Sequence, residues 1–293
     1  MTAAKPTVTR PTGIERRPGF NRWPGIAALL PFFVVLFAFC LLPAAWVLVS
    51  SRPADGDHWY ANFAEIVGSP FYRQAFGNSL EVSLGSSLAG LLIAMLGAAS
   101  LQRVPGRLRN AVVAFANMSS NLSGVPLAFA FIILFGANGT LTLIMRHWGW
   151  IDDMHLYSLD GLILIYTYFQ IPLGVLMLYP AFDALDDDWR NAAAQLGAGP
   201  LAYWRHIGLP VLAPAVAGTF ILLFANAMGA YASAFALTTG NINLVTIRIA
   251  SLVAGDIFLQ PDLAAALAVL LMTLLALVTA ANHWLLNRSH HVR

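Results

Sequence analysis

Six stretches of this sequence are each apolar over about 20 or more residues. They are Ile26–Val49, Leu80–Leu101, Ala111–Phe135, Leu159–Leu178, Val211–Leu237 and Leu263–Leu286. About 20 residues of helix cross the roughly 30 Å hydrocarbon core of a bilayer. Because backbone polar groups in hydrocarbon must bond within the protein, each stretch is predicted to be a helix. The sequence therefore predicts an all-α polytopic membrane protein with six transmembrane helices.

Composition agrees with a lipid bilayer as the surrounding medium. Of the 293 residues, 58% are hydrophobic and 10% are charged, whereas about 25% are charged in a typical soluble domain. The net charge of +2 is small, and it reflects how Lys and Arg divide across the membrane, not binding to nucleic acid. The composition therefore excludes an ordinary soluble protein, and no nucleic-acid partner is predicted.

The basic residues divide unequally between the two sides of a six-span arrangement. Twelve lie on the side of the N-terminus: Lys5, Arg10, Arg16, Arg17, Arg22, Arg103, Arg107, Arg109, Arg190, Arg205, Arg288 and Arg293. The other side holds Arg52, Arg73, Arg146 and Arg248. Short loops rich in Lys and Arg stay in the cytoplasm. Both termini are therefore predicted to be cytoplasmic.

The chain is expected to contain one membrane domain, 26–287, with a tail at each end. Residues 1–25 are rich in Pro, Thr and Arg and are predicted to be a disordered cytoplasmic tail, and 288–293 form a short cytoplasmic tail. A cleaved signal peptide is the alternative for the N-terminus. The first apolar run is too long for the core of a signal peptide, which favours the tail.

A spaced signature lies in the predicted cytoplasmic loop at 181–210, between the fourth and fifth spans. It reads Asn191-Ala192-Ala193-x3-Gly197-x9-Ile207-x-Leu209-Pro210. Acidic residues just before it favour a helix N-terminus, and Gly197 and Gly199 interrupt that helix before a second one at Leu201–His206. Two short helices around a glycine turn suit a groove on a partner protein. A solvated connection without a partner is the alternative.

This signature resembles the coupling loop of permease subunits in binding-protein-dependent ATP-binding-cassette (ABC) importers. The pattern of that family is Glu-Ala-Ala, three residues, Gly, nine residues, and Ile-x-Leu-Pro. Every fixed position and both spacings match, except that Asn191 replaces Glu. Asn keeps the hydrogen-bonding capacity of Glu and lacks its charge. The resemblance implies a type I ABC importer fold in a bacterial inner membrane, with ATPase coupling through Asn191, Ala192, Ala193, Gly197, Ile207, Leu209 and Pro210.

The resemblance also implies partners and a class of solute. The expected partners are ABC ATPase subunits, a second permease subunit, a periplasmic solute-binding protein and the lipid bilayer. The stretch Phe135-Gly136-x-x-Gly139-x-Leu141 is similar to permeases of the polyamine, ferric-iron and phosphonate import group. That similarity favours a paralogue over a second copy as the partner permease. A polyamine or 2-aminoethylphosphonate is the expected solute, with a sugar or ferric iron as alternatives.

ATP hydrolysis is not expected on this chain. A P-loop uses a lysine to reach the nucleotide phosphates, and the only lysine is Lys5, without a Gly-x4-Gly-Lys-Ser/Thr motif. No cofactor, metal site or catalytic group is therefore predicted here, and ATP and Mg²⁺ are expected on a partner ATPase. An ion-coupled secondary transporter is the alternative function. It would use inverted repeats and ionisable groups at mid-membrane, but Glu81, the single carboxylate within a span, lies near the outer end.

Polar side chains inside the predicted spans are candidates for a transport path. Five polar residues occur within seven positions of the third span, from Asn117 to Ser123. Such groups either bond between helices or face water, and their density favours a path. The predicted path residues are Asn117, Ser120, Asn121, Tyr166, Gln170, Asn226 and Tyr231. For Gln170, path lining and interhelical bonding are equally favoured.

Overall fold

The structure is a computed structural model that describes residues 22–53, 58–151, 155–254 and 259–290. The chain divides into two units, Met1–Trp46 and Val47–Arg293, and each is described by itself. The described residues form helices and connections, with no strand among them. The prediction of an all-α protein is confirmed.

Runs of shorter helices separate four long ones, α4, α8, α11 and α14. The part up to the fourth apolar stretch contains α1 (Arg22–Leu36), the π-helical turn η1 (Phe37–Leu41), α2 (Leu42–Ser50), α3 (Ala61–Gly68), α4 (Pro70–Leu101), α5 (Gly106–Ser120), α6 (Val125–Phe135), α7 (Thr140–His147) and α8 (Leu159–Asp183). The part after it contains α9 (Asp187–Gln195), α10 (Pro200–Tyr203), the π-helical turn η2 (Trp204–Gly208), α11 (Leu209–Gly229), α12 (Ala232–Thr238), α13 (Val245–Ala254) and α14 (Pro261–His290).

Six helical segments are long and apolar enough to cross a bilayer, as the sequence predicts. They are Leu29–Ser50, Pro70–Leu101, Val125–His147, Leu159–Asp183, Pro200–Gly229 and Pro261–Trp284. No residue of the first segment is buried. The first four residues of α1 lie within the predicted tail at 1–25, and the rest of that tail is outside the described residues. At the other end, α14 extends into the predicted tail as far as His290.

Two predicted spans are not continuous helices, which corrects the sequence prediction. The third, predicted at Ala111–Phe135, is α5 and α6 separated by a break at 121–124. At this break Gly124 has φ +76°, and Pro126 lies in the first turn of α6, where its missing N–H leaves no helical bond unmade. The fifth, predicted at Val211–Leu237, breaks after Gly229 and resumes as α12. Apolar composition alone does not distinguish a broken helix from a continuous one.

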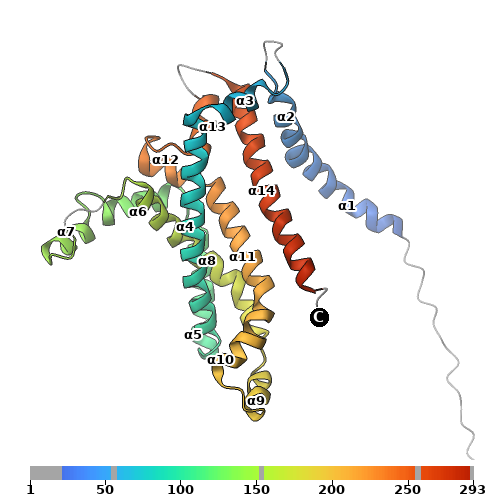
Figure 1. Ribbon diagram of the computed structural model, residues 1–293, viewed down its shortest axis with the longest axis vertical. Coiled ribbons are helices and arrows are strands. Elements are labelled where there is room, and N and C mark those ends of the chain that lie inside the picture. The colour runs from blue at the N-terminus through green and yellow to red at the C-terminus, as the bar shows by residue number, and fades with distance from the viewer. Residues whose placement is uncertain (1–21, 54–57, 152–154, 255–258, 291–293) are drawn as a thin grey trace, which may run out of the picture. The chain divides into compact units, whose positions relative to one another are not determined.

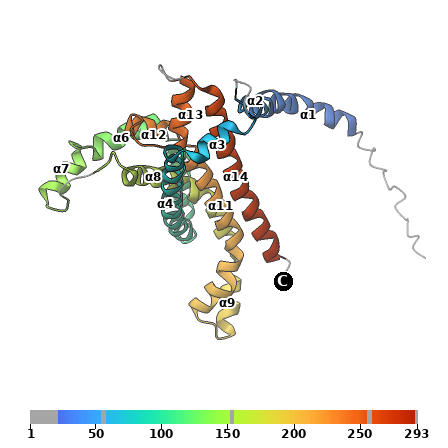
Figure 2. The same ribbon diagram turned by 45° about the horizontal axis from the view of Figure 1, so that its top comes forward.

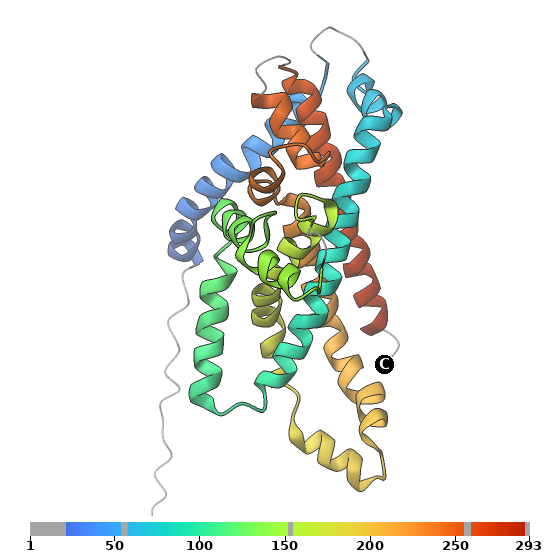
Figure 3. The same cartoon turned by 90° about the vertical axis from the view of Figure 1, so that its left-hand side faces the viewer.

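The second unit is built around α4 and α8, which pack closely along their lengths (Figures 1 and 3). Small residues allow the close approach: a Cβ added at Gly174 of α8 would lie 2.7 Å from Ala94 Cβ of α4. Gln170, fully buried, donates to Ser86 Oγ at 2.8 Å and accepts from Ser87 Oγ at 3.1 Å. Van der Waals contact between closely packed backbones and hydrogen bonds between helices are main contributions to helix association in a membrane.

The helices of the loop between α8 and α11 lie at the opposite end of this unit from α3 and α13. Figures 1 and 2 show α9 at one end, and α3 and α13 at the other. The segment before α13 is fastened to α4 through Asn243, whose amide donates to the Phe71 carbonyl at 2.8 Å. Arg248 Nε donates to Asn243 Oδ1 at 2.7 Å, so this end is held by polar contacts.

Replacing Gly174 by Ala should destabilise the protein by about 1–3 kcal/mol, the usual effect of overpacking. The added methyl group must push α4 away from α8, because it would lie 2.7 Å from Ala94 Cβ. Gly218→Ala in α11 is the matched control, since a Cβ there meets nothing within 4 Å. Thermal unfolding in detergent measures both variants. An unchanged melting temperature for Gly174→Ala, with Gly218→Ala also unchanged, contradicts the close packing.

Candidate functional site

The loop between α8 and α11 folds as two short helices around a glycine turn, as the sequence predicts. Asp186 precedes α9 and its carboxylate accepts from the Asp188 N–H at 3.0 Å, which caps the helix. After α9 the turn contains Gly197 with φ +77°, a conformation that costs an L side chain about 1–2 kcal/mol. Pro200 then begins α10. The change of direction between the two helices therefore depends on Gly197.

A second glycine of the loop is required by packing. A Cβ on Gly208 would lie 2.5 Å from the ring of Trp204, which is well inside contact distance. The two residues are the first and last of η2, and α11 follows directly. The signature assigns Gly208 no role, because it falls at the variable position between Ile207 and Leu209. Only the packing of the Trp204 ring identifies it.

The tip of the loop presents apolar side chains to solvent. Leu196 is 88% exposed and Leu201 is 83% exposed, one on each side of the glycine turn. Beside them an apolar groove of about 430 Å³ is lined by Trp189, Ala192, Ala193, Leu196, Ala198, Ala202, Tyr203, His206 and Ile207. Contiguous exposed apolar surface is found where a protein contacts another protein, a membrane or a ligand. The loop therefore has the surface that a docking element needs.

The groove gathers three of the seven predicted coupling residues. Ala192, Ala193 and Ile207 line it, and Ala193 is also buried, which fixes α9 against the rest of the loop. The other four, Asn191, Gly197, Leu209 and Pro210, lie outside it. Asn191 is exposed on α9. Gly197 instead sets the turn that holds the two walls of the groove in place.

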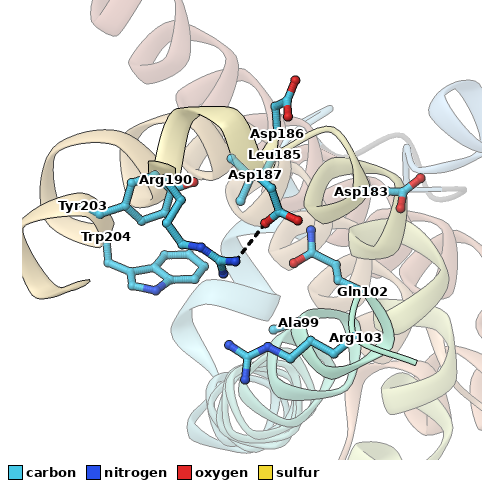
Figure 4. A pocket seen from close by; sticks show the side chains of 10 residues that line it. All are labelled: Ala99, Gln102, Arg103, Asp183, Leu185, Asp186, Asp187, Arg190, Tyr203 and Trp204. Atoms are coloured by element: carbon cyan, nitrogen blue, oxygen red, sulfur yellow. Dashed lines mark ion pairs between the residues drawn. The ribbon is translucent and has the colours of Figure 1, made fainter. Parts of the chain in front are cut away.

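A different face of α9 borders a polar cavity of about 520 Å³ at the C-terminal ends of α4 and α8 (Figure 4). Its lining residues are Ala99, Gln102, Arg103, Asp183, Leu185, Asp186, Asp187, Arg190, Tyr203 and Trp204. Arg190 pairs with Asp187 at 3.0 Å, one helical turn away, and both are exposed. The Gln102 amide donates to the Phe182 carbonyl in the last turn of α8. The base of the loop is therefore bonded to the turn that follows α4.

A third cavity, of about 510 Å³, lies where the two broken helices meet. It is lined by Ser120, Ser123, Gly124, Phe169, Leu173, Ala225, Asn226, Gly229, Ala230, Tyr231, Ala232 and Ser233. Hydroxyl and amide groups come from the ends of α5 and α11 and the start of α12, and α8 supplies an apolar wall. Within this lining no side chain carries a full charge at neutral pH. We call it the break cavity.

The breaks that form this cavity are held by specific hydrogen bonds. The Gly124 N–H donates to Ser233 Oγ at 3.0 Å, which joins the first break to α12. The buried Tyr166 hydroxyl donates to the Ala230 carbonyl at 2.8 Å, in the second break. Irregular backbone at membrane depth is tolerated only where it is buried in protein or lines a water-filled cavity. These side chains supply bonds that the broken helices lack.

The structure brings together some of the predicted path residues and separates others. Three of them, Ser120, Asn226 and Tyr231, line the break cavity. Asn117 and Asn121 are exposed on α5 and at its end, and their amides donate to the carbonyls of Val113 and Asn117 in the same helix. Tyr166 and Gln170 are buried and bond within the protein. For Gln170 the structure matches the interhelical interpretation.

Three polar groups of the break cavity are absent from the residues that the sequence predicts for the path. They are the Ser123 hydroxyl, the Gly124 backbone and the Ser233 hydroxyl. A signal for the first break was present, because Gly124-Val125-Pro126 places a glycine and a proline next to the polar cluster. Ser233 had no comparable signal, since its importance comes from a residue 109 positions earlier in the chain.

Sequence comparison gives the family. Residues 86–290 match the family model described as "Binding-protein-dependent transport system inner membrane component". The thiamine transport system permease protein ThiP of Escherichia coli (strain K12) is 26% identical over 260 residues, which cover 88% of this chain and 46% of ThiP. The chain thus spans about half the length of that relative.

Two further relatives match over most of their own length. The molybdenum transport system permease protein ModB of Mycobacterium tuberculosis (strain ATCC 25618 / H37Rv) is 28% identical, over 75% of this chain and 81% of ModB. The spermidine/putrescine transport system permease protein PotB of Haemophilus influenzae (strain ATCC 51907 / DSM 11121 / KW20 / Rd) is 25% identical, over 77% of this chain and 81% of PotB.

Solved structures show the same fold at low sequence identity. A chain of a bacterial ABC transporter involved in the import of the acidic polysaccharide alginate superposes with a TM-score of 0.72 at 16% identity, covering 91% of this chain and 96% of that one. A chain of the MetNI methionine ABC transporter gives a TM-score of 0.54 at 18% identity, covering 74% and 94%. With the family match over residues 86–290, the chain belongs to the binding-protein-dependent transport system inner membrane components.

Proposed function

We propose that this chain is the permease subunit of an ATP-driven, binding-protein-dependent importer in a bacterial inner membrane. It forms half of the path for a small polar solute. The observation that carries the proposal is the continuity between loop and cavity. Helix α8 leads into the loop and α11 leads out of it, and both helices line the break cavity. A force applied to the loop therefore reaches the cavity through two helices.

The loop is the contact for a separate ATPase subunit, which binds ATP and Mg²⁺. Leu196, Leu201 and the groove beside them provide the apolar surface for that contact. Closure of two ATPase subunits draws the loops of two permeases together and opens the path outward, and hydrolysis resets it. The solute passes polar groups such as Asn226 and Tyr231, which replace part of its hydration.

The remaining partners and the solute class follow the same reasoning. A second permease, favoured as a paralogue, completes the path, and a periplasmic binding protein delivers the solute. A polyamine or 2-aminoethylphosphonate is our leading choice, and the name of the relative PotB supports the polyamine. The names of ThiP and ModB add thiamine and molybdenum as candidates. Uptake of spermidine, 2-aminoethylphosphonate, thiamine and molybdate by cells producing the whole importer distinguishes these four.

Replacing Gly197 by Val should reduce both ATPase association and transport while the protein still inserts into the membrane. The backbone at Gly197 has φ +77°, which a β-branched residue adopts only with strain. Gly199→Val is the matched control in the same loop, because Gly199 has φ −71° and a Cβ at either position meets nothing within 4 Å. Co-purification of the ATPase measures the effect. Equal recovery of ATPase with both variants counts against the docking role.

The loop should be accessible from the cytoplasm only. In a Cys40→Ala background, Gln195→Cys in the loop should resist an impermeant thiol reagent added to intact cells, because basic residues keep this side inside. Gln260→Cys, just before α14, should react, since it lies at the other end of the spans. Both positions are exposed, so access decides the result. Labelling at position 195 in intact cells, with none at 260, rejects the proposed orientation.

Replacing Asn226 by Leu should lower uptake by roughly two- to tenfold, because one neutral hydrogen bond contributes about 0.5–1.5 kcal/mol. Asn226→Gln, which keeps the amide, should retain more activity. Uptake is measured with whichever of the four candidate solutes the unchanged importer accumulates, and the amount of assembled complex is measured in parallel. If Asn226→Leu transports normally per assembled complex, this side chain does not contribute to the path.

A further inference from the structure

Three helices that line the break cavity differ in how they are joined to the coupling loop. Helices α8 and α11 are continuous with the loop in the chain. Helix α5 comes earlier in the sequence and is not adjacent to the loop in the chain. Yet α5 ends at Ser120, in the cavity wall. Figure 3 shows α5 rising from the end of the molecule at which α9 lies. The turn 102–105 joins the start of α5 to α4, and any direct connection from α5 to the end of α8 is non-covalent.

Packing holds the C-terminal end of α5, beside the break cavity, more than its N-terminal end around Arg109, which we call its foot. Its buried residues are Ala116 and Ser119, both in the last turns of the helix. By contrast, α8 has buried residues along its whole length, down to Phe182 in its last turn. The foot of α5 thus contains no buried residue, and Arg109 supplies side-chain contacts from it to α8.

Two side chains make the connection at the foot. Arg109 Nη1 lies 3.5 Å from Oδ1 of Asp183, which is the last residue of α8. The same guanidinium lies 5.7 Å from the centre of the Tyr179 ring, one turn earlier in α8, within the range of a cation–π contact. In the turn before α5, Gln102 donates to the Phe182 carbonyl. All of these contacts reach the last turns of α8, directly before the loop.

We propose that Arg109 is a positioning residue that keeps α5 in step with α8 when the ATPase moves the coupling loop. Its pairing with Asp183, supported by Gln102, carries the displacement of the loop base into α5 and so to the Ser120 wall of the break cavity. The proposal rests on the proposed importer function and adds a third mechanical route to those through α8 and α11. Without Arg109, the foot of α5 does not follow the displacement of the last turn of α8.

This role is separate from stability. Arg109 and Asp183 are both partly exposed, with 34% and 52% of their side chains accessible. Ion pairs of that kind contribute little to the free energy of folding, because water screens them. The pair is not needed to hold the resting fold, in which the cavity end of α5 is already packed. It is needed when the loop moves and the N-terminal end of α5 must stay in contact with the C-terminal end of α8.

The test uses the complete importer with its ATPase in lipid nanodiscs. Spin labels are placed at Met118 of α5 and Leu222 of α11, both exposed, in a Cys40→Ala background. The distance distribution is recorded without nucleotide and after trapping with ATP and vanadate. The unchanged complex should give a narrow distribution in both states. Arg109→Asp should give a broadened distribution in the trapped state only, with ATP hydrolysis retained and less solute carried per ATP.

Two further variants make the result specific. The exchange Arg109→Asp with Asp183→Arg restores the opposite charges and should restore the narrow distribution. Arg107→Asp makes the same change on the same helix at an exposed residue without an ion pair in the described structure, and it should behave like the unchanged complex. Arg109→Gln gives the same comparison without charge repulsion if the charge reversal prevents assembly.

The outcomes separate this proposal from the proposed function. A complex that neither hydrolyses ATP nor transports any of the four candidate solutes overturns the importer function itself. A functional complex in which Arg109→Asp and Arg109→Gln keep the narrow trapped distribution overturns the role of Arg109. The same holds if Arg107→Asp broadens the distribution as much, because the effect is then one of charge at the foot of α5 and not of the pair.

Discussion

The requirement that backbone N–H and C=O groups in hydrocarbon be bonded within the protein governs this structure. It makes every span helical, and it allows a helix to break only where other groups satisfy the freed backbone. Here the Ser233 hydroxyl accepts from Gly124 and the Tyr166 hydroxyl donates to Ala230. Both interruptions lie beside the break cavity. The position of the cavity is therefore determined by where the chain supplies these bonds.

The second unit combines a rigid pair of helices with a more loosely attached one. The close packing of α4 and α8 depends on Gly174 and on the buried amide of Gln170, which leave little freedom between the two backbones. Helix α5 has a lightly packed foot and a packed cavity end. The proposed importer would use both properties, because a displacement of the loop would pass through the closely packed helices and move the α5 wall of the break cavity.

Much of this arrangement could be predicted from sequence, because its causes are local. Apolar length predicts the spans, and the acidic residues and Gly197 predict the two loop helices. The failures have non-local causes. Gln170 could be buried or exposed until α4 was placed beside it, and Ser233 acquires its role from Gly124, far away in the chain. The second break has no sign in hydropathy, because apolar residues continue on both sides of Gly229. The first has a local signal in Gly124-Val125-Pro126 beside the polar cluster, but the apolar length of the predicted span outweighs it.

The exposed leucines of the loop tip have a consequence for how the subunit is made. Leu196 and Leu201 lie at the tip of the loop, on either side of the Gly197 turn, and both are almost fully exposed. Until they are covered, they are available to chaperones, proteases and other unassembled chains, since exposed apolar surface promotes association. In the proposed importer, a subunit produced without its ATPase partner would therefore leave these two apolar side chains uncovered. The same two side chains that would receive mechanical work would also report whether assembly has finished.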